Sequence, residues 1–170
     1  MMNLLFKFGR IATASLLNCA LLTASAGWLP AQTPVTPKAV PPQAKSTLTV
    51  HITGFRNANG RIKIALYRDG KGFPSDPSSA IASQSFEIDS QTLSASAVFK
   101  DLPQGVYAAS VLHDEKMTGK MEFDSQGIPQ SGYGISNNPD THYGPPTPEQ
   151  AIFKVNQAET TIEIKMVYWQ

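Results

Sequence analysis

The chain has 170 residues, with 14 Lys and Arg against 13 Asp and Glu and a formal net charge of +1. This balance excludes a protein that binds nucleic acid through massed cations, because such binding depends on Lys and Arg gathered on one face. Thirteen prolines and twelve glycines exclude a coiled coil and indicate many turns. The composition also excludes a multi-span membrane protein, and it favours a single exported all-β domain.

Residues 1–26 have the three parts of a secretory signal peptide. Lys7 and Arg10 supply the positive region, residues 11–22 form an apolar stretch, and Ala24-Ser25-Ala26 provides the small-x-small cleavage pattern. The apolar stretch is too short for a membrane-spanning helix, which needs about 20 residues. We therefore expect a cleaved signal, an exported protein that is periplasmic or extracellular, and no transmembrane span after cleavage.

Cleavage after Ala26, or alternatively after Gln32, would remove Cys19, the sole cysteine. The mature domain would then have no disulfide available and would depend on its hydrophobic core for stability. Cys19 lies inside the apolar stretch and follows an Asn, which is a poor match to a lipidation site. Residues 27–46 are rich in proline and have no apolar period, so they are predicted to form an extended linker ahead of a domain at 47–170.

Two runs, at 47–53 and 61–67, place apolar residues at every second position, as half-buried strands do. The apolar positions are Leu48, Val50 and Ile52 in the first run, and Ile62, Ile64 and Leu66 in the second. Between them, residues 57–60 read Asn-Ala-Asn-Gly, which are residues that tolerate turn conformations. The two runs are therefore predicted to pair as a β-hairpin.

Further strands are predicted at 84–88, 93–99, 106–112, 151–155 and 160–168, separated by turn residues. No segment shows a convincing helical period. About seven short alternating strands are typical of a two-sheet antiparallel β-sandwich. The fold class predicted is therefore all-β, an antiparallel sandwich with one long ordered loop at 113–149.

Three aromatic or histidine residues are given structural roles by the pattern. Tyr107 follows a Pro-Gln-Gly turn, where its hydroxyl can bond back to the backbone as in the tyrosine corner of Greek-key sandwiches. Phe73, in a Gly- and Pro-rich loop at 69–79, is expected to cover one end of the core. His51 falls on the polar face of its strand and is expected at the surface.

The 113–149 segment is the predicted binding region, because loops of this length without regular structure are uncommon and often functional. Exposed tyrosines and the glycines in it suit a carbohydrate or peptide surface. The candidates for binding are Tyr133, Ser136, Asn137, Asn138 and Tyr143. The leading hypothesis is a non-enzymatic binding or structural module of the cell envelope, whose partner is a carbohydrate or protein component.

The same loop also carries candidate metal ligands, namely His113, Asp114, Glu122, Asp124, Asp140 and His142. Acidic residues around Gly119 echo the order of a calcium loop, which alternates oxygen ligands and uses a Gly for its sharp turn. Lys116 and Thr118 stand where further ligands belong, and a lysine places a cation at the ion's position. No cofactor is therefore expected, and a calcium-stabilised structural domain is kept as an alternative.

A metal-assisted hydrolase is the second alternative, with His113, Asp114, Asp140 and His142 as ligands at the two ends of the loop. No Ser/His/Asp set in a nucleophile-elbow context is present, and a nucleophilic cysteine would be lost with the signal. The sequence therefore leaves enzymatic activity undecided and favours a protein without it.

The order LPQGVYAASVLHDE followed by GIPQSGYGISNN resembles the bacterial exported family known as domain of unknown function 2141. The resemblance extends over about residues 47–168 and implies a transthyretin-like or immunoglobulin-like sandwich with no established activity. The family's loop pattern, D-x-N-x-N-G-x-L-D, is matched at Asp114 and Gly119, with Glu122 a further candidate, and is broken at Lys116 and Thr118. The chain's end, Val-Tyr-Trp-Gln, lacks the Tyr-Arg-Gly-Ser of sandwiches that hydrolyse 5-hydroxyisourate, so that activity is not implied.

Overall fold

The computed structural model describes residues 44–142 and 144–169. The predicted signal peptide and nearly all of the predicted linker lie outside the described residues. The elements in chain order are β1 (Lys45–Thr53), β2 (Arg61–Arg68), the 3-10 helix η1 (Pro77–Ser79), β3 (Ala82–Phe86), β4 (Ala95–Pro103), β5 (Gly105–Asp114), β6 (Gly132–Ile135), α1 (Pro148–Ala151), β7 (Phe153–Val155) and β8 (Glu159–Lys165).

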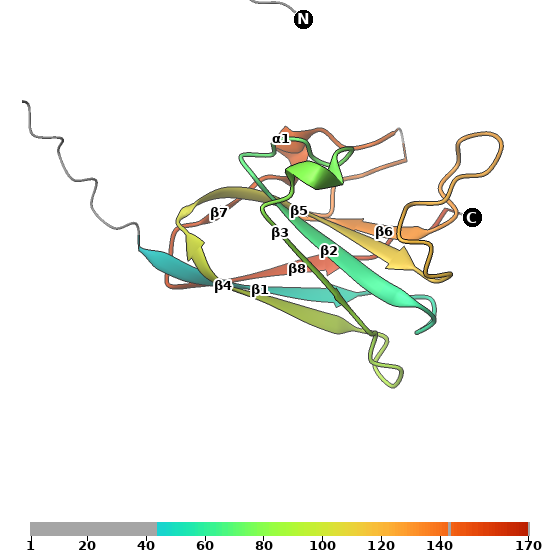
Figure 1. Ribbon diagram of the computed structural model, residues 1–170, viewed down its shortest axis with the longest axis horizontal. Coiled ribbons are helices and arrows are strands. Elements are labelled where there is room, and N and C mark those ends of the chain that lie inside the picture. Colours follow the sequence, from blue (N-terminus) through green and yellow to red (C-terminus); the bar gives the residue numbers. More distant parts are fainter. Residues whose placement is uncertain (1–43, 143, 170) are drawn as a thin grey trace, which may run out of the picture. The chain divides into compact units, whose positions relative to one another are not determined.

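The strands form two sheets that face each other across one core (Figure 1). The first sheet has the order β4-β1-β8, in which β1 and β4 are antiparallel and β1 and β8 are parallel. The second sheet has the order β3-β2-β5-β6, and β7 pairs with the N-terminal part of β5 on the same edge as β6. The predicted all-β sandwich is confirmed, with one parallel pair and one strand more than the sequence indicated.

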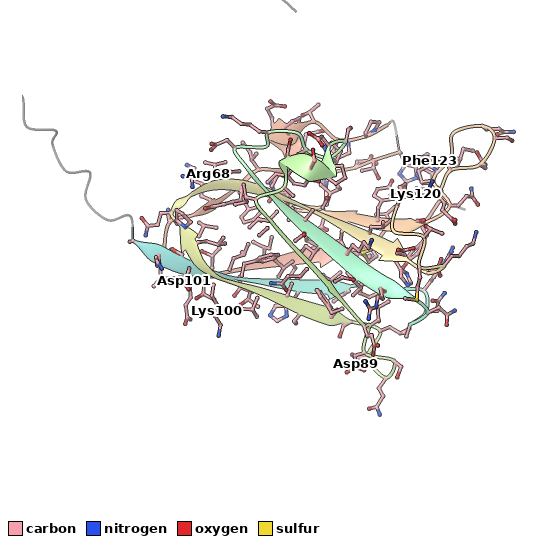
Figure 2. The ribbon with its side chains drawn as sticks, in the orientation of Figure 1. Arg68, Asp89, Lys100, Asp101, Lys120 and Phe123 are labelled. Atoms are coloured by element: carbon pink, nitrogen blue, oxygen red, sulfur yellow. The ribbon has the colours of Figure 1, made fainter. Side chains whose placement is uncertain are left out.

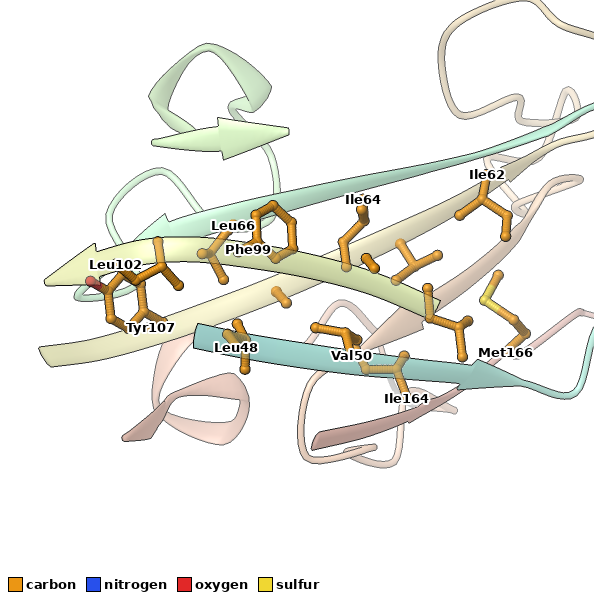
Figure 3. Close-up of a cluster of buried hydrophobic side chains, with 14 of the residues drawn as sticks. Leu48, Val50, Ile62, Ile64, Leu66, Phe99, Leu102, Tyr107, Ile164 and Met166 are labelled. Atoms are coloured by element: carbon orange, nitrogen blue, oxygen red, sulfur yellow. The ribbon is translucent and has the colours of Figure 1, made fainter. Parts of the chain in front are cut away.

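Side chains fill the space between the two sheets (Figure 2), and most of the apolar ones are buried. The labelled core residues in Figure 3 are Leu48, Val50, Ile62, Ile64, Leu66, Phe99, Leu102, Tyr107, Ile164 and Met166. The alternating residues of β1 and β2 therefore face inward, as their period predicted. Burying a side chain of this size stabilises the fold by about 1.5–3 kcal/mol.

The predicted hairpin between the first two strands is wrong. β1 pairs with β4 and β8 in the first sheet, whereas β2 pairs with β3 and β5 in the second. Residues 54–60 cross from one sheet to the other, and Phe55 in this connection is buried in the core. Alternation shows which face of a strand is buried, but both sheets bury a face against the same core, so the pattern does not assign strand partners.

The tyrosine corner and the position of His51 are confirmed. The buried Tyr107 hydroxyl donates a hydrogen bond to the carbonyl of Pro103. His51 is exposed on the outer face of the first sheet, with its Nδ1 atom 2.9 Å from Ser96 Oγ. Phe73 is buried as predicted, but in a different place. It packs edge-on against the Tyr67 ring in a small cluster outside the second sheet, not over the end of the main core.

Strand β6 lies within the segment predicted to be an unbroken loop, and its composition hides it from sequence analysis. Its sequence is Gly-Tyr-Gly-Ile, and neither glycine has a side chain to show a period. A Cβ atom at Gly132 would lie 2.2 Å from the ring of Tyr168, and one at Gly134 would lie 2.6 Å from Ile164 Cγ2. β6 can therefore run close to the end of the first sheet only because these two positions are glycine.

Candidate functional site

A pocket of about 800 Å³ lies on the outer face of the second sheet, the face turned away from the main core. Its floor is formed by Lys63, Ala65 and Tyr67 of β2 and by Ser110 and Leu112 of β5. These residues alternate along their strands with core residues, so the pleat directs them outward. The outer face of the second sheet is thus hollowed over strands β2 and β5.

Three loops and the C-terminal end of the described chain form the walls of the pocket, whose accessible surface is mostly carbon. The wall residues include Pro74 and Pro77 from the β2–β3 connection, Met121, Phe123, Ile128 and Pro129 from the loop after β5, Thr141, His142, Pro145 and Pro146 from the connection between β6 and α1, and Trp169 after β8. Phe123 is 59% exposed and Trp169 is 39% exposed. Two large aromatic side chains are therefore held at the pocket without being buried by the protein itself.

The first sheet has no comparable surface on its own outer face within the described residues. Apart from Val98, its outward positions are polar or charged, such as Thr49, Thr161, Glu163 and Lys100. The sequence holds a weak signal of this difference, since the outward positions of β2 include Ala65 and Tyr67. A strand period alone identifies the core face, so it did not single out Lys63, Ser110 or Trp169 as site residues.

Tyr133 is the predicted binding residue that lines the pocket. Its hydroxyl lies 2.7 Å from Thr141 Oγ1 and accepts a hydrogen bond from the indole N–H of Trp169 at 3.2 Å. These bonds fix both aromatic rings at one wall and leave their faces as apolar surface. Tyr143, the other predicted aromatic, lies outside the described residues.

Hydrogen bonds from the remaining predicted binding residues link the end of β6 to β5, to α1 and to β8. These residues are Ser136, Asn137 and Asn138. Ser136 is fully buried, and its hydroxyl accepts from the Ala109 N–H and lies 2.6 Å from the Ala151 carbonyl. The Asn137 amide donates to the carbonyls of Gln150 and Ile152. The Asn138 side chain bonds the backbone of Glu163 and Lys165 in β8. Their polar groups are thus engaged by the fold.

We expect Ser136→Ala to destabilise the domain by about 1–3 kcal/mol, because it leaves a buried N–H and a buried carbonyl without their partner. Urea unfolding followed by circular dichroism measures this loss. Ser125→Ala is the matched control, since Ser125 is exposed on the loop after β5, and its effect should fall within about 0.5 kcal/mol. Equal stabilities of the two variants would contradict the structural role given to Ser136.

The three carboxylates of the predicted calcium loop are each occupied by donors of the protein. Asp114 accepts from the backbone N–H groups of Thr118 and Gly119 at 2.8 and 2.7 Å. Asp124 accepts from the N–H groups of Gln126 and Ile128, both at 2.9 Å. Glu122 forms an ion pair with Lys116 at 2.8 Å, and this contact raises the pKa of the Lys116 ammonium. The carboxylates of the loop are therefore held by backbone hydrogen bonds and by Lys116, which stands where a calcium loop would have a further ligand.

The two histidines of the predicted metal site occupy different surroundings. His113 is fully buried, and its Nε2 atom donates to the carbonyl of Asn59 at 2.8 Å while Nδ1 lies 2.7 Å from the Tyr168 hydroxyl. His142 is exposed, and its Nδ1 atom lies 3.2 Å from Asp140. Within residues 44–142 and 144–169, no three His, Cys, Asp or Glu side chains are grouped closely enough to hold a metal ion.

A polar cluster surrounds His113 at the end of the sandwich. The Arg56 guanidinium bonds both carboxylate oxygens of Glu115 and stacks 4.7 Å from the centre of the Tyr168 ring. The hydrogen bond to Arg56 holds the pKa of Glu115 below its ordinary value, and burial raises the pKa of the Tyr168 hydroxyl. Asn57 adds a further donor to Glu115. Each polar group in this cluster has a hydrogen-bond partner within the protein, which indicates that the cluster has a structural role at this end of the sandwich.

Three comparisons with known proteins place the chain among its relatives. A family model described as an uncharacterized protein conserved in bacteria (DUF2141) matches residues 50–163. No curated protein matches the chain. A solved structure of an alternative pilotin from the type II secretion system of Vibrio cholerae is 17% identical, covers 74% of this chain and 100% of its own, and has a TM-score of 0.32. A likeness this weak does not bear on function. Among the described residues, no helix has the length and apolar character needed to cross a membrane.

Proposed function

Since the chain belongs to the bacterial family DUF2141, whose sandwich here carries a hollowed outer face, we propose that it is a non-enzymatic binding module that holds an apolar ligand in this pocket. Export through residues 1–26 and a location in the cell envelope are part of the proposal. The observation that carries it is the pocket on β2, β5 and β6. Its volume of about 800 Å³ falls within the range of about 300–1,000 Å³ found for small-molecule sites.

The lining favours an apolar or aromatic ligand over a carbohydrate. A sugar brings many hydroxyl groups, and each one that is buried without a hydrogen-bond partner costs free energy. The short polar side chains among the described lining residues are Ser75, Ser110 and Thr141, and Thr141 is already bonded to Tyr133. The pocket thus offers carbon surface in quantity and few hydrogen-bonding groups.

The hydrolase alternative receives less support from the described residues. A catalytic metal needs about three protein ligands and an open position. The ring nitrogens of His113 both have partners within the protein, and His142 pairs with Asp140 at the surface. The proposal therefore assigns these residues no catalytic role.

Nile red, a neutral apolar dye whose fluorescence rises in apolar surroundings, tests the proposal on the full chain. We expect saturable binding that Ser110→Trp weakens at least tenfold, because an indole at the centre of the floor fills the pocket. Ser110 is half-buried, and its side chain has no hydrogen bond to lose within the described structure. The measurement is a fluorescence titration of dye against protein.

Thr161→Trp is the matched control, since it adds the same side chain to an exposed position on the outer face of the first sheet. This variant should bind the dye as the parent chain does. Circular dichroism would verify that both variants fold. Equal loss of binding in the two variants, or none in Ser110→Trp, would refute the assignment of the pocket.

A further inference from the structure

From the charges around the pocket, we infer that its ligand is a single-chain amphiphile with an anionic head, such as a fatty acid. In this arrangement Lys63 and Lys120 bind the carboxylate, and the chain lies over Ala65 toward Tyr67. The inference rests on the proposed function and goes further by naming the chemical class of the ligand and its orientation.

Two lysines lie together at one end of the pocket. Lys63 extends from β2 and donates from its ammonium group to the carbonyl of Gly119 at 3.1 Å. Lys120 is the residue directly after Gly119, and it lies near Phe123 on the loop after β5 (Figure 2). Lys120 is exposed and has no carboxylate within ion-pair distance in the described structure. Two positive charges therefore lie at this end, and neither has an acidic partner within ion-pair distance in the described structure.

No carboxylate offsets these charges from the described lining, which contains neither Asp nor Glu. The acidic residues of the neighbouring loops are engaged elsewhere. Asp114 accepts from the backbone of its own loop, Glu122 pairs with Lys116, and Asp140 contacts His142. An anion entering this end of the pocket would thus meet cations without competing protein carboxylates.

The pocket changes character along β2. Lys63, Ala65 and Tyr67 project from the same face of the strand, and four residues of strand extend about 13 Å. Beyond Tyr67 the wall is formed by Pro74 and Pro77, both carbon surfaces. A ligand that satisfies both ends must have a charged group at one end and an apolar body of comparable length.

The bounded shape favours a single chain over a membrane surface. Loops from three parts of the sequence stand around the floor, so the apolar surface is reached from within a pocket. A protein that binds a bilayer instead presents a protruding apolar face or a broad polybasic patch, and anionic lipids contribute about 1 kcal/mol per basic residue. Two lysines at the end of a concave site fit one carboxylate better.

Isothermal titration calorimetry of the full chain with decanoate, decanol and decyltrimethylammonium tests the inference, with the two ions below their micelle concentrations and decanol below its solubility limit. We expect decanoate to bind about five- to tenfold more tightly than decanol, since an exposed charge pair contributes modestly and there are two of them. The advantage of decanoate should shrink as salt is added, because screening weakens exposed charge interactions. Decyltrimethylammonium should bind most weakly.

The double variant Lys63→Gln/Lys120→Gln should lose the preference for decanoate and leave decanol binding within twofold. Lys100→Gln, on β4 of the first sheet and far from the pocket along the molecule (Figure 2), should keep the preference. Equal binding of decanoate and decanol would overturn this inference and leave the proposed function intact. Absence of binding by both would overturn the two together. Binding of phosphatidylglycerol vesicles without binding of free decanoate would overturn the single-chain ligand.

Discussion

We expect Gly60→Ala to destabilise the domain by about 3 kcal/mol, enough to remove a large part of the stability of a small protein. Gly60 has a φ of +70°, a conformation that costs a residue with a Cβ atom about 1–2 kcal/mol. The added Cβ would also lie 2.1 Å from the carbonyl oxygen of Asp114 and 2.6 Å from the Cα of Glu115. These are backbone atoms at the end of β5, and they cannot rotate out of the way.

The measurement is urea unfolding with linear extrapolation to water. Gly127→Ala is the control that separates the two costs, because Gly127 has a φ of +81° but no atom within 4 Å of the place that a Cβ would take. This variant should lose only the conformational term of about 1–2 kcal/mol, and the remaining difference is the steric clash, for which overpacking costs of about 1–3 kcal/mol are usual. Equal losses of stability in the two variants would contradict the close approach of Gly60 to the backbone of Asp114 and Glu115.

Ile64→Ala is expected to cost about 2–5 kcal/mol, the range for removing a large aliphatic side chain from a packed core. Ile64 is 1% exposed and lies at the centre of β2, between the two sheets (Figure 3). The residues around it belong to strands of both sheets, so they cannot move together to fill the cavity without disturbing strand pairing. The loss of stability should appear in thermal and in urea unfolding.

Ile81→Ala makes the same chemical change at a residue that is 49% exposed, and it should cost less than about 1 kcal/mol. Because both variants replace Ile by Ala, the difference between their losses of stability reports the effect of burial alone. If both variants lost the same stability, Ile64 would not be the core residue that the two-sheet packing requires.

The fold was predictable where one residue pattern had one physical cause. The inward alternation of β1 and β2, and the Tyr107 hydroxyl at its turn, followed from the period of a pleated strand and from the chemistry of a Pro-Gly turn. Strand pairing was not predictable in this way. Residues 54–60 contain turn-forming residues, but the same residues also serve a crossover between sheets, in which Phe55 packs in the core.

The candidate site was predictable in part. The length of the 113–149 segment pointed to a region that contributes several lining residues to the pocket, Tyr133 among them. Ser136 and its asparagine neighbours have the composition of a polar loop, yet their partners are backbone groups of α1 and β8 that are distant in sequence. The floor of the pocket could not be recognised without knowing that β2 and β5 are neighbours, because Lys63 and Ser110 are brought together only by that pairing.

Binding of a ligand on the outer face of the second sheet can be located residue by residue through amide chemical-shift mapping of the isotope-labelled full chain with decanoate. We expect shifts concentrated at Lys63, Ser110, Leu112 and Tyr133, with the outward residues of β1 and β8 unchanged. Shifts confined to the first sheet, such as at Thr49 and Thr161, would refute binding at the pocket, as would saturating decanoate that leaves the resonances of the pocket floor in place.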